Sequence, residues 1–212
     1  MTERKKPLEG LVVLDLTRVL AGPFAGMMLA DMGARVIKVE NPQGGDDARA
    51  YTPFQNGESA YFMSLNRGKE SVTLNLKHPE GKRILKELAA RADILVENYK
   101  PGTMKKLGLD YDVLSRVNPR LIYAASSGFG QTGPYSDRPA YDLIVQGMGG
   151  LQSITGTDPK HPLKVGSSMA DILAGIFAVT GVLAALHHRD LTGRGQMVDV
   201  AMLDCLVATL EN

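Results

Sequence analysis

Asp171 is the residue of this sequence best placed to do chemistry. It stands between a run of mostly small residues, Gly166 to Ala170, and a long apolar segment, Ile172 to Leu186. One interpretation is structural: at a helix N-cap its carboxylate would accept hydrogen bonds from free N–H groups of the first turn, worth about 1 kcal/mol. The other is chemical. The apolar segment predicts a helix that is buried on every side, and a carboxylate held ionised by the helix dipole at its N-terminal end can act as a nucleophile. The residues alone favour the structural interpretation.

Other patterns resemble known motifs without fitting them. Gly128 to Gly133 has the spacing G-x-G-x-x-G, yet Pro134 follows where a dinucleotide site requires a helix N-terminus. His187 and His188 are adjacent, so they face different directions on a helix, and we expect no metal site. The sequence contains no G-x-S-x-G motif, so nothing predicts a serine nucleophile.

Composition and charge exclude several classes of protein. The chain has 212 residues, 24 Lys and Arg against 23 Asp and Glu, and one cysteine. This charge balance predicts no basic surface for nucleic acid, and Cys205 is expected to be a buried, inert thiol. Met1 to Lys6 lacks the apolar region of a signal peptide, and Ile172 to Leu186 falls short of the roughly 20 residues that span a bilayer. We therefore predict a cytoplasmic protein that binds neither nucleic acid nor membrane.

The segments around these residues predict an α/β fold. Apolar runs predict strands at 10–16, 35–40, 92–97 and 120–126, and an alternating apolar and polar pattern predicts one at 70–76. Periodic or capped segments predict helices at 24–33, 78–91, 104–107 and 111–117. A polar loop is expected at 41–57 and a linker at 156–164, before a long final helix. A strand, a helix and a second strand in succession imply a right-handed crossover and a parallel sheet. Such sheets bind ligands beyond the carboxyl ends of their strands. The turn Thr17 to Pro23, which follows the first strand, is therefore a candidate ligand site.

Several longer segments together resemble one protein family. In chain order they are PLEGLVVLDLTRVLAGPFAGMMLADMGARVIKVE, NRGKESVTLNLK, VENYKPGTMKKLGLDYDVL, SGFGQTGPYSDRPAYDLIVQGMGG and VGSSMADILAGIFAVTGVLAALHHRDLTGRGQMVDVAML. They are similar to the family III CoA-transferases, among them formyl-CoA transferase and the carnitine CoA-transferases, and to the related α-methylacyl-CoA racemase. The resemblance covers nearly all of residues 7–212. It implies a Rossmann-like parallel sheet flanked by helices, in a large domain that binds coenzyme A.

The resemblance also implies an activity and a nucleophile. Enzymes of this family move coenzyme A from an acyl-CoA donor to a small carboxylic acid, and their nucleophilic aspartate follows a G-x-x-x-x-D segment that Asp171 matches here. The carboxylate forms a mixed anhydride and then an aspartyl-CoA thioester, which the acceptor acid resolves in reverse. Coenzyme A is thus expected as a substrate, with no permanently bound cofactor.

The residues expected to contact coenzyme A come from several segments. The resemblance supplies the first turn, the segment after Glu40, and positions near Leu74 and Asn98. The phosphates of a nucleotide thioester also need cations, for which nearby Arg and Lys residues are candidates, with ordinary surface charge as their alternative role. The full set is Arg18, Val19, Leu20, Ala21, Arg49, Leu74, Asn98, Tyr99, Lys105 and Lys106.

Gln131 and Tyr141 are expected in the substrate pocket. In the racemase branch a histidine occupies the position of Tyr141, where it works with the same aspartate. Tyrosine is a poor general base near neutral pH, so the sequence favours a transferase over a racemase. The racemase reaction remains the alternative activity.

Length sets this sequence apart from the family. Its members are longer, with a smaller second domain and a returning C-terminal segment, and they form interlocked homodimers. We therefore expect residues 1–212 to be the N-terminal part of the large domain, and a fragment that binds coenzyme A without activity is a further alternative. The donor and acceptor acids are not predicted.

Overall fold

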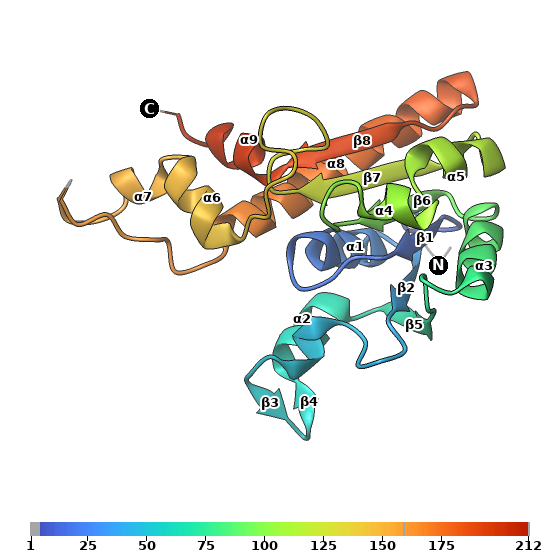
Figure 1. Ribbon diagram of the computed structural model, residues 1–212, viewed down its shortest axis with the longest axis horizontal. Coiled ribbons are helices and arrows are strands. Elements are labelled where there is room, and N and C mark those ends of the chain that lie inside the picture. The colour runs from blue at the N-terminus through green and yellow to red at the C-terminus, as the bar shows by residue number, and fades with distance from the viewer. Residues whose placement is uncertain (1–4, 159, 212) are drawn as a thin grey trace.

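A six-stranded parallel sheet forms the centre of the computed structural model, which describes residues 5–158 and 160–211 (Figure 1). Its strands are β1 (Val12–Asp15), β2 (Arg35–Glu40), β5 (Lys69–Thr73), β6 (Ile94–Glu97), β7 (Ile122–Ser127) and β8 (Met197–Ala201). They lie in the order β5-β2-β1-β6-β7-β8, and all neighbouring strands are parallel. The chain starts in the middle of the sheet, adds strands to one side and then to the other, which is the Rossmann strand order. The predicted fold class is confirmed.

Helices cover both faces of the sheet. One face carries α1 (Ala21–Asp31), α8 (Met169–Thr192) and α9 (Met202–Val207), and the other carries α3 (Pro79–Ala89), α4 (Thr103–Leu107) and α5 (Tyr111–Val117). Successive side chains of a strand point to opposite faces, so Val13 of β1 joins the core under α1 and α8, whereas Leu14 joins the core under α3 and α5. Both side chains are almost wholly buried.

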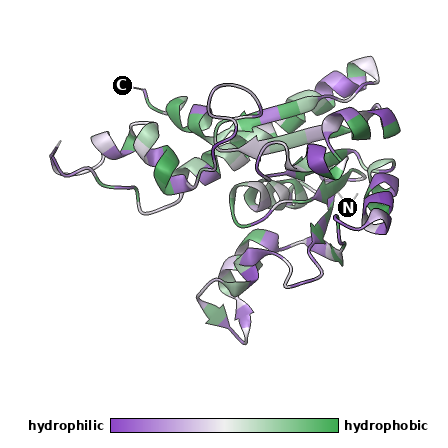
Figure 2. Ribbon diagram, in the orientation of Figure 1, coloured by the Kyte–Doolittle hydropathy of each residue, from purple (hydrophilic) through white to green (hydrophobic). Residues whose placement is uncertain are grey.

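Two smaller groups of elements project from the sheet (Figure 1). The first comprises the 3-10 helix η1 (Asp47–Ala50), β3 (Phe54–Gln55), β4 (Glu58–Ser59) and α2 (Ala60–Asn66), which packs on α1. The second comprises α6 (Asp142–Met148) and α7 (Leu151–Ile154). Much of α6 is green in Figure 2, the colour of hydrophobic residues. Its Leu143, Ile144 and Met148 are exposed.

The strands and helices predicted from the sequence are present, with ends shifted by up to three residues. The expected loop at 41–57 also contains η1 and β3, and the expected final helix is followed by β8 and α9. The linker at 156–164 has no helix or strand in its described part, and residue 159 lies outside it. Residues 1–4 of the predicted polar N-terminus also lie outside the described residues.

Helix α8 differs from expectation in both length and burial. Its 24 residues make it long and apolar enough to cross a membrane by length and composition, although Ile172 to Leu186 alone are too few. The prediction of burial on every side is wrong. Ala174, Ala178 and Val182 are buried on the face toward the core, whereas Ile176, Phe177 and Leu183 are exposed. This helix therefore covers the sheet with one apolar face and leaves a second apolar face open in this chain.

Candidate active site

The loops that follow β1 and β6 meet where the strand order reverses. The Arg18 N–H donates to Oδ1 of Asn98 at 2.8 Å, and Nδ2 of Asn98 donates to the Arg18 carbonyl at 2.8 Å. This pair of hydrogen bonds joins two predicted contact residues that are 80 positions apart in the sequence. In open parallel sheets the crevice at such a reversal is the usual ligand site.

Val19 holds the first loop in a strained conformation. Its φ of 68° lies in the left-handed region, which a β-branched residue rarely adopts. Its N–H donates to Oδ1 of Asp46 at 3.0 Å, so the strained residue is anchored to the loop after β2. The turn leads directly into α1, whose N-cap residue is Leu20.

Buried ion pairs support these loops from below. Nζ of Lys38 lies 2.8 Å from Oδ2 of Asp46 and donates to the Thr17 carbonyl at 2.8 Å. Lys69 pairs with Asp15 at 2.8 Å. Burial alone would raise the pKa of Asp15, but the charges of Lys69 and Lys38 outweigh it and lower that pKa. Separating such a pair would leave an uncompensated buried charge, which is costly. The loops that carry Thr17 and Asp46 are therefore held in place by Lys38.

A cavity of about 840 Å³ opens beside the joined loops. Arg18, Arg49, Leu74 and Tyr99 from the predicted set line it. The loops after β2 and β5 and two residues of α4 complete its wall. A volume of this size is within the range of small-molecule and cofactor sites. The structure thus brings together predicted residues from four separate segments.

The two predicted arginines of this cavity already have acidic partners. Arg18 pairs with Asp47 at 3.0 Å, and its guanidinium lies 5.8 Å from the centre of the Tyr99 ring. Arg49 donates two hydrogen bonds of 2.8 Å to Glu40. Burial would raise the pKa of Glu40, but hydrogen bonds from Arg49 and its other donors lower it to about 2. Arg49 therefore balances a buried carboxylate as well as lining the cavity.

Lys77 is a lining residue that the sequence analysis missed. It follows β5 in the segment Asn75 to Lys77, all of which lines the cavity. Its side chain is exposed, and no carboxylate pairs with it within residues 5–158 and 160–211. The loop between Leu74 and the His78-Pro79 helix start was the available signal, because strand ends face the crevice.

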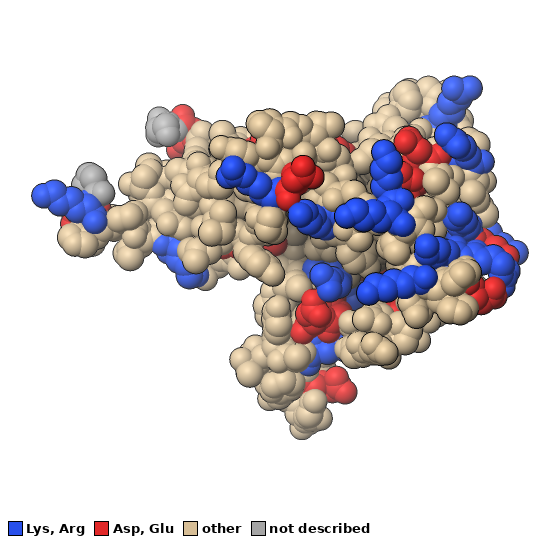
Figure 3. All heavy atoms as spheres, viewed as in Figure 1, with Lys and Arg blue, Asp and Glu red and all other residues tan. Residues whose placement is uncertain are grey.

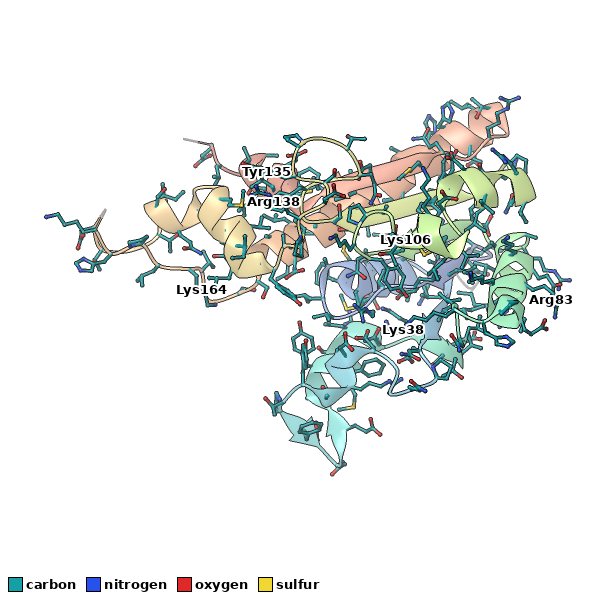
Figure 4. All side chains as sticks on the ribbon, viewed as in Figure 1. Lys38, Arg83, Lys106, Tyr135, Arg138 and Lys164 are labelled. Carbon is teal, nitrogen blue, oxygen red and sulfur yellow. The ribbon has the colours of Figure 1, made fainter. Side chains whose placement is uncertain are left out.

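Lys105, Lys106 and Gln131 lie apart from this cavity. Lys105 and Gln131 line a second cavity, of about 530 Å³, together with Glu97. Lys106 is exposed on α4, in the band of basic side chains that crosses this face (Figures 3 and 4). In the loop that carries Gln131, the Gln131 backbone N–H donates a hydrogen bond to Asp199 at 3.0 Å. The guanidinium of Arg138 stacks on the ring of Tyr135 in the same loop, and the two side chains are neighbours in Figure 4.

Glu97 is the most deeply buried acid of the second cavity. Burial raises its pKa to about 7, against hydrogen bonds from the Tyr99 N–H and the Tyr123 hydroxyl. No sequence pattern indicates this shift, since Glu97 simply ends an apolar strand.

Asp171 is the third residue of α8, and the N-cap is Ser168. The prediction that Asp171 stands at the N-cap is therefore wrong, because the helix begins at Met169. The backbone N–H of Ala21, at the start of α1, faces the Asp171 carboxylate and lowers its pKa, so two helix N-termini converge on this group. Tyr141 lies at the N-cap of α6, where its side chain is 79% exposed.

Burial determines the charge state of Asp171. It raises the pKa of this carboxyl to about 7, with a second contribution from the negative charge of Asp142, while the backbone N–H of Ala21 acts in the opposite direction. Burial thus outweighs the helix dipole that was expected to hold the group ionised. Tyr61 also lies near this site, and its burial, followed by the charge of Asp171, raises the tyrosine pKa to about 12.

The segment Thr17 to Ala21 connects the cavity to Asp171. Thr17 and Arg18 line the cavity, and Ala21 contacts the carboxylate. A raised pKa makes a carboxylate more nucleophilic while leaving a large fraction ionised at neutral pH. The Asp171 carboxylate is thus suited to attack a ligand that extends from the cavity along Thr17 to Ala21.

Other reactive groups are less suitable. Burial raises the pKa of Cys205 to about 11, so its thiol stays protonated. Within the described part of the chain, no three His, Cys, Asp or Glu residues group in a way that would hold a metal ion. His187 and His188 are both exposed near the end of α8.

The sequence matches the family model for CoA-transferase family III over residues 8–212. It is 51% identical to a succinate–glutarate CoA-transferase of Agrobacterium fabrum, covering 100% of this chain and 55% of that protein. It is 49% identical to an acetyl-CoA:oxalate CoA-transferase of Acetobacter aceti, covering 98% of this chain and 54% of the relative. The chain thus spans about half the length of the curated relatives it matches.

Two solved structures match the fold of this chain closely. A CAIB/BAIF family protein from Brucella suis superposes with a TM-score of 0.94 at 45% identity, over 99% of this chain and 56% of that one. Rv3272 from Mycobacterium tuberculosis superposes with a TM-score of 0.90 at 42% identity, over 97% of this chain and 58% of that one.

Proposed function

This chain belongs to CoA-transferase family III, and from that premise we propose that it carries the coenzyme A site and the nucleophile of an enzyme that moves coenzyme A between carboxylic acids. The observation that carries the proposal is the partly buried carboxylate of Asp171 at the meeting point of two helix N-termini, joined to a nucleotide-sized cavity by the segment Thr17 to Ala21. The family membership supports coenzyme A as the ligand.

The proposed reaction begins with attack by Asp171. Its carboxylate oxygen bonds to the acyl carbon of the donor thioester, and coenzyme A leaves as the thiolate, which yields a mixed anhydride. The thiolate attacks the Asp171 carbonyl of the anhydride and expels the donor acid, leaving an aspartyl-CoA thioester. The acceptor carboxylate attacks that thioester carbonyl and again releases the thiolate. Attack of the thiolate on the acceptor's acyl carbon gives the new acyl-CoA and restores the Asp171 carboxylate. Every bond broken is replaced, so the thioester energy is conserved in the site.

The cavity residues suit a nucleotide. Leu74 and Tyr99 offer apolar surface for the adenine ring, and the charges of Arg18 and Lys77 face a space where phosphates fit. The thioester end would follow the strained turn at Val19 toward Ala21 and Asp171. The lysines of α4 lie farther along the same face and are proposed to contribute charge to the approach of the anionic ligand.

Short dicarboxylic acids are the proposed acceptors. The relatives at 46–51% identity are named for glutarate, oxalate, malate and mesaconate, and most of them are named for succinyl-CoA as well. We propose succinyl-CoA as the first donor to test. We also propose a homodimer, in keeping with the exposed apolar side chains of α6 and α8.

The test is a transfer assay on this protein. Succinyl-CoA is incubated with glutarate, oxalate, malate and acetate in turn, and new acyl-CoA is detected by mass spectrometry. Transfer to a dicarboxylate that is lost on Asp171→Ala would support the proposal. Solvent deuterium exchange at the α-carbon of a 2-methylacyl-CoA, without any acceptor acid, would support the racemase alternative instead. Binding of coenzyme A without transfer or exchange would support a role limited to coenzyme A binding.

A further inference from the structure

The first turn of α8, which carries Asp171, is capped by another helix. Ser168 at its N-cap makes no side-chain capping hydrogen bond within the structure described. Oδ1 of Asp142 instead accepts a hydrogen bond from the Ala170 N–H at 2.8 Å. Asp142 is the first residue of α6 and stands 28 positions before Ala170. The residue immediately before Asp171 is thus fixed from outside its own helix.

Gln146 holds Asp142 in this orientation. Its Nε2 donates to Oδ2 of Asp142 at 2.6 Å and to the Ser167 carbonyl at 3.1 Å, and its Oε1 accepts from the Val165 N–H at 2.9 Å. The side chain is fully buried, with 0% of its surface exposed. One amide therefore ties α6 to both ends of the turn that leads into α8. A buried amide with all these bonds made is rigid, and losing one leaves a buried polar group without a partner.

We propose that Gln146 and Asp142 are positioning residues for Asp171, and that they hold the first turn of α8 so that its carboxylate faces the incoming acyl group. This inference rests on the proposed role of Asp171 as the nucleophile. Neither residue needs to touch the substrate. Their effect comes from geometry, because a displacement of about 1 Å in a reacting group can reduce a rate about 100-fold.

Asp142 also acts on Asp171 through its charge. The two carboxylates lie near each other at the same helix end, and the charge of Asp142 is the second contribution, after burial, to the raised pKa of Asp171. The positioning residue thereby also helps to keep the nucleophile reactive.

The test compares three variants with a matched control. Gln146→Met keeps the volume of the side chain and removes its three hydrogen bonds, and Asp142→Ala removes the cap. Asp142→Asn keeps an acceptor oxygen for the Ala170 N–H. The control is Asn118→Leu, since the Asn118 side chain also makes three hydrogen bonds, all of them to backbone atoms, but lies at the end of α5, away from Asp171.

Two readouts are needed, one of which does not depend on activity. Hydrogen exchange at the Ala170 amide is expected to accelerate about 10-fold or more in Gln146→Met and Asp142→Ala, and to stay close to wild type in Asn118→Leu. The rate constant for acylation of Asp171 by succinyl-CoA is expected to fall about 100-fold in the same two variants, with the KM for succinyl-CoA changing less than about threefold. Asp142→Asn is expected to recover part of the lost protection at Ala170, because it keeps an acceptor for that N–H. It is expected to recover less of the acylation rate, because it loses the acceptor for Gln146 and the charge that raises the pKa of Asp171.

Each outcome decides the inference. Unchanged protection of Ala170 in both Gln146→Met and Asp142→Ala would overturn it, as would lost protection with acylation at the wild-type rate. If the wild-type protein forms no adduct, the proposed function fails. The exchange rate at Ala170 would then still show whether Gln146 and Asp142 fix this turn.

Discussion

Asp171 shows how opposing influences set the reactivity of one side chain. Two helix N-termini favour its ionised form, whereas burial and the charge of Asp142 favour the protonated form, and the result is a pKa of about 7. A carboxyl with its ordinary pKa near 4 would be fully ionised at neutral pH but a weaker nucleophile. At neutral pH the Asp171 carboxyl is therefore partly protonated, and its ionised fraction is more nucleophilic than an ordinary carboxylate.

This balance predicts that removing the charge stabilises the protein. The pKa of Asp171 is raised in the folded state, so ionisation costs folding free energy as pH increases from about 4 to about 7 and remains costly above that. Asp171→Asn is therefore expected to unfold at higher denaturant concentration than wild type, with the difference small at pH 4 and largest at pH 8. Urea unfolding at several pH values measures it. A difference that is constant across this range would contradict the assigned pKa.

At the scale of elements, the close approach of α1 and α8 forms the site. Gly175 makes this approach possible: a Cβ placed there would lie 2.9 Å from the Ala21 carbonyl and 2.9 Å from Cδ1 of Phe24. Because Gly175 stands one turn after Asp171, the same contact that packs the helices also places the carboxylate beside the Ala21 backbone.

Gly175→Ala is expected to force the two helices apart. The clash should cost about 1–2 kcal/mol of folding free energy, after allowing for the higher helix propensity of alanine. Gly166→Ala is the control, because nothing lies within 4 Å of a Cβ there, and its effect should stay within about 0.5 kcal/mol. Urea unfolding of both variants tests this expectation. Equal stabilities would show that α1 and α8 are not in close contact at Gly175.

The Glu40–Arg49 pair links the end of β2 to the cavity, and acid should break it. The pKa of Glu40 falls from 4.5 to about 2 on folding, so its stabilisation is complete above pH 4.5 and is lost as pH falls toward 2. Allowing for the partial exposure of Arg49, Glu40→Gln should cost about 2 kcal/mol at pH 7. The stabilities of wild type and variant should converge near pH 2. A gap that persists at pH 2 would mean that the pair does not account for the loss.

At the scale of the whole molecule, the sequence predicted the strands and helices better than the side-chain contacts of the site. Apolar runs located the strands of the sheet interior, because strands buried on both faces have a clear signal. The strand β8 was missed because the exposed Asp199 interrupts its short apolar pattern. The family resemblance pointed to Asp171 and Asn98, and the need for phosphate-binding cations pointed to Arg18. The structure shows that Arg18 and Asn98 are hydrogen-bonded to each other.

Two features were not predictable from the sequence: the hydrogen bond by which Asp142 caps α8, and the pairing of Arg49 with the buried Glu40. Each depends on residues brought together by tertiary packing, and neither leaves a local pattern in the chain. The burial of Asp171 likewise follows from the packing of α1 on α8. Apolar content had suggested a helix buried on every side, whereas one apolar face of α8 remains exposed in this chain.

Lys77 tests whether the cavity is the coenzyme A site. Its charge lines the cavity without a carboxylate partner in the described part of the chain, so Lys77→Ala is expected to weaken coenzyme A binding about 5- to 10-fold. Lys82→Ala, on α3 and outside the lining, should bind like wild type. Calorimetric titration with coenzyme A at fixed salt provides the comparison. Equal affinities for both variants would place the nucleotide elsewhere.

The most direct test of the central claim is to trap the enzyme-bound thioester. The protein is incubated with succinyl-CoA, treated with borohydride and digested, and the peptide that contains Asp171 is analysed by mass spectrometry. Borohydride reduces an aspartyl thioester to the alcohol, so we expect homoserine at position 171, dependent on succinyl-CoA and absent from Asp171→Asn. Reduction at another residue, or labelling that survives Asp171→Asn, would contradict the assignment of Asp171 as the nucleophile.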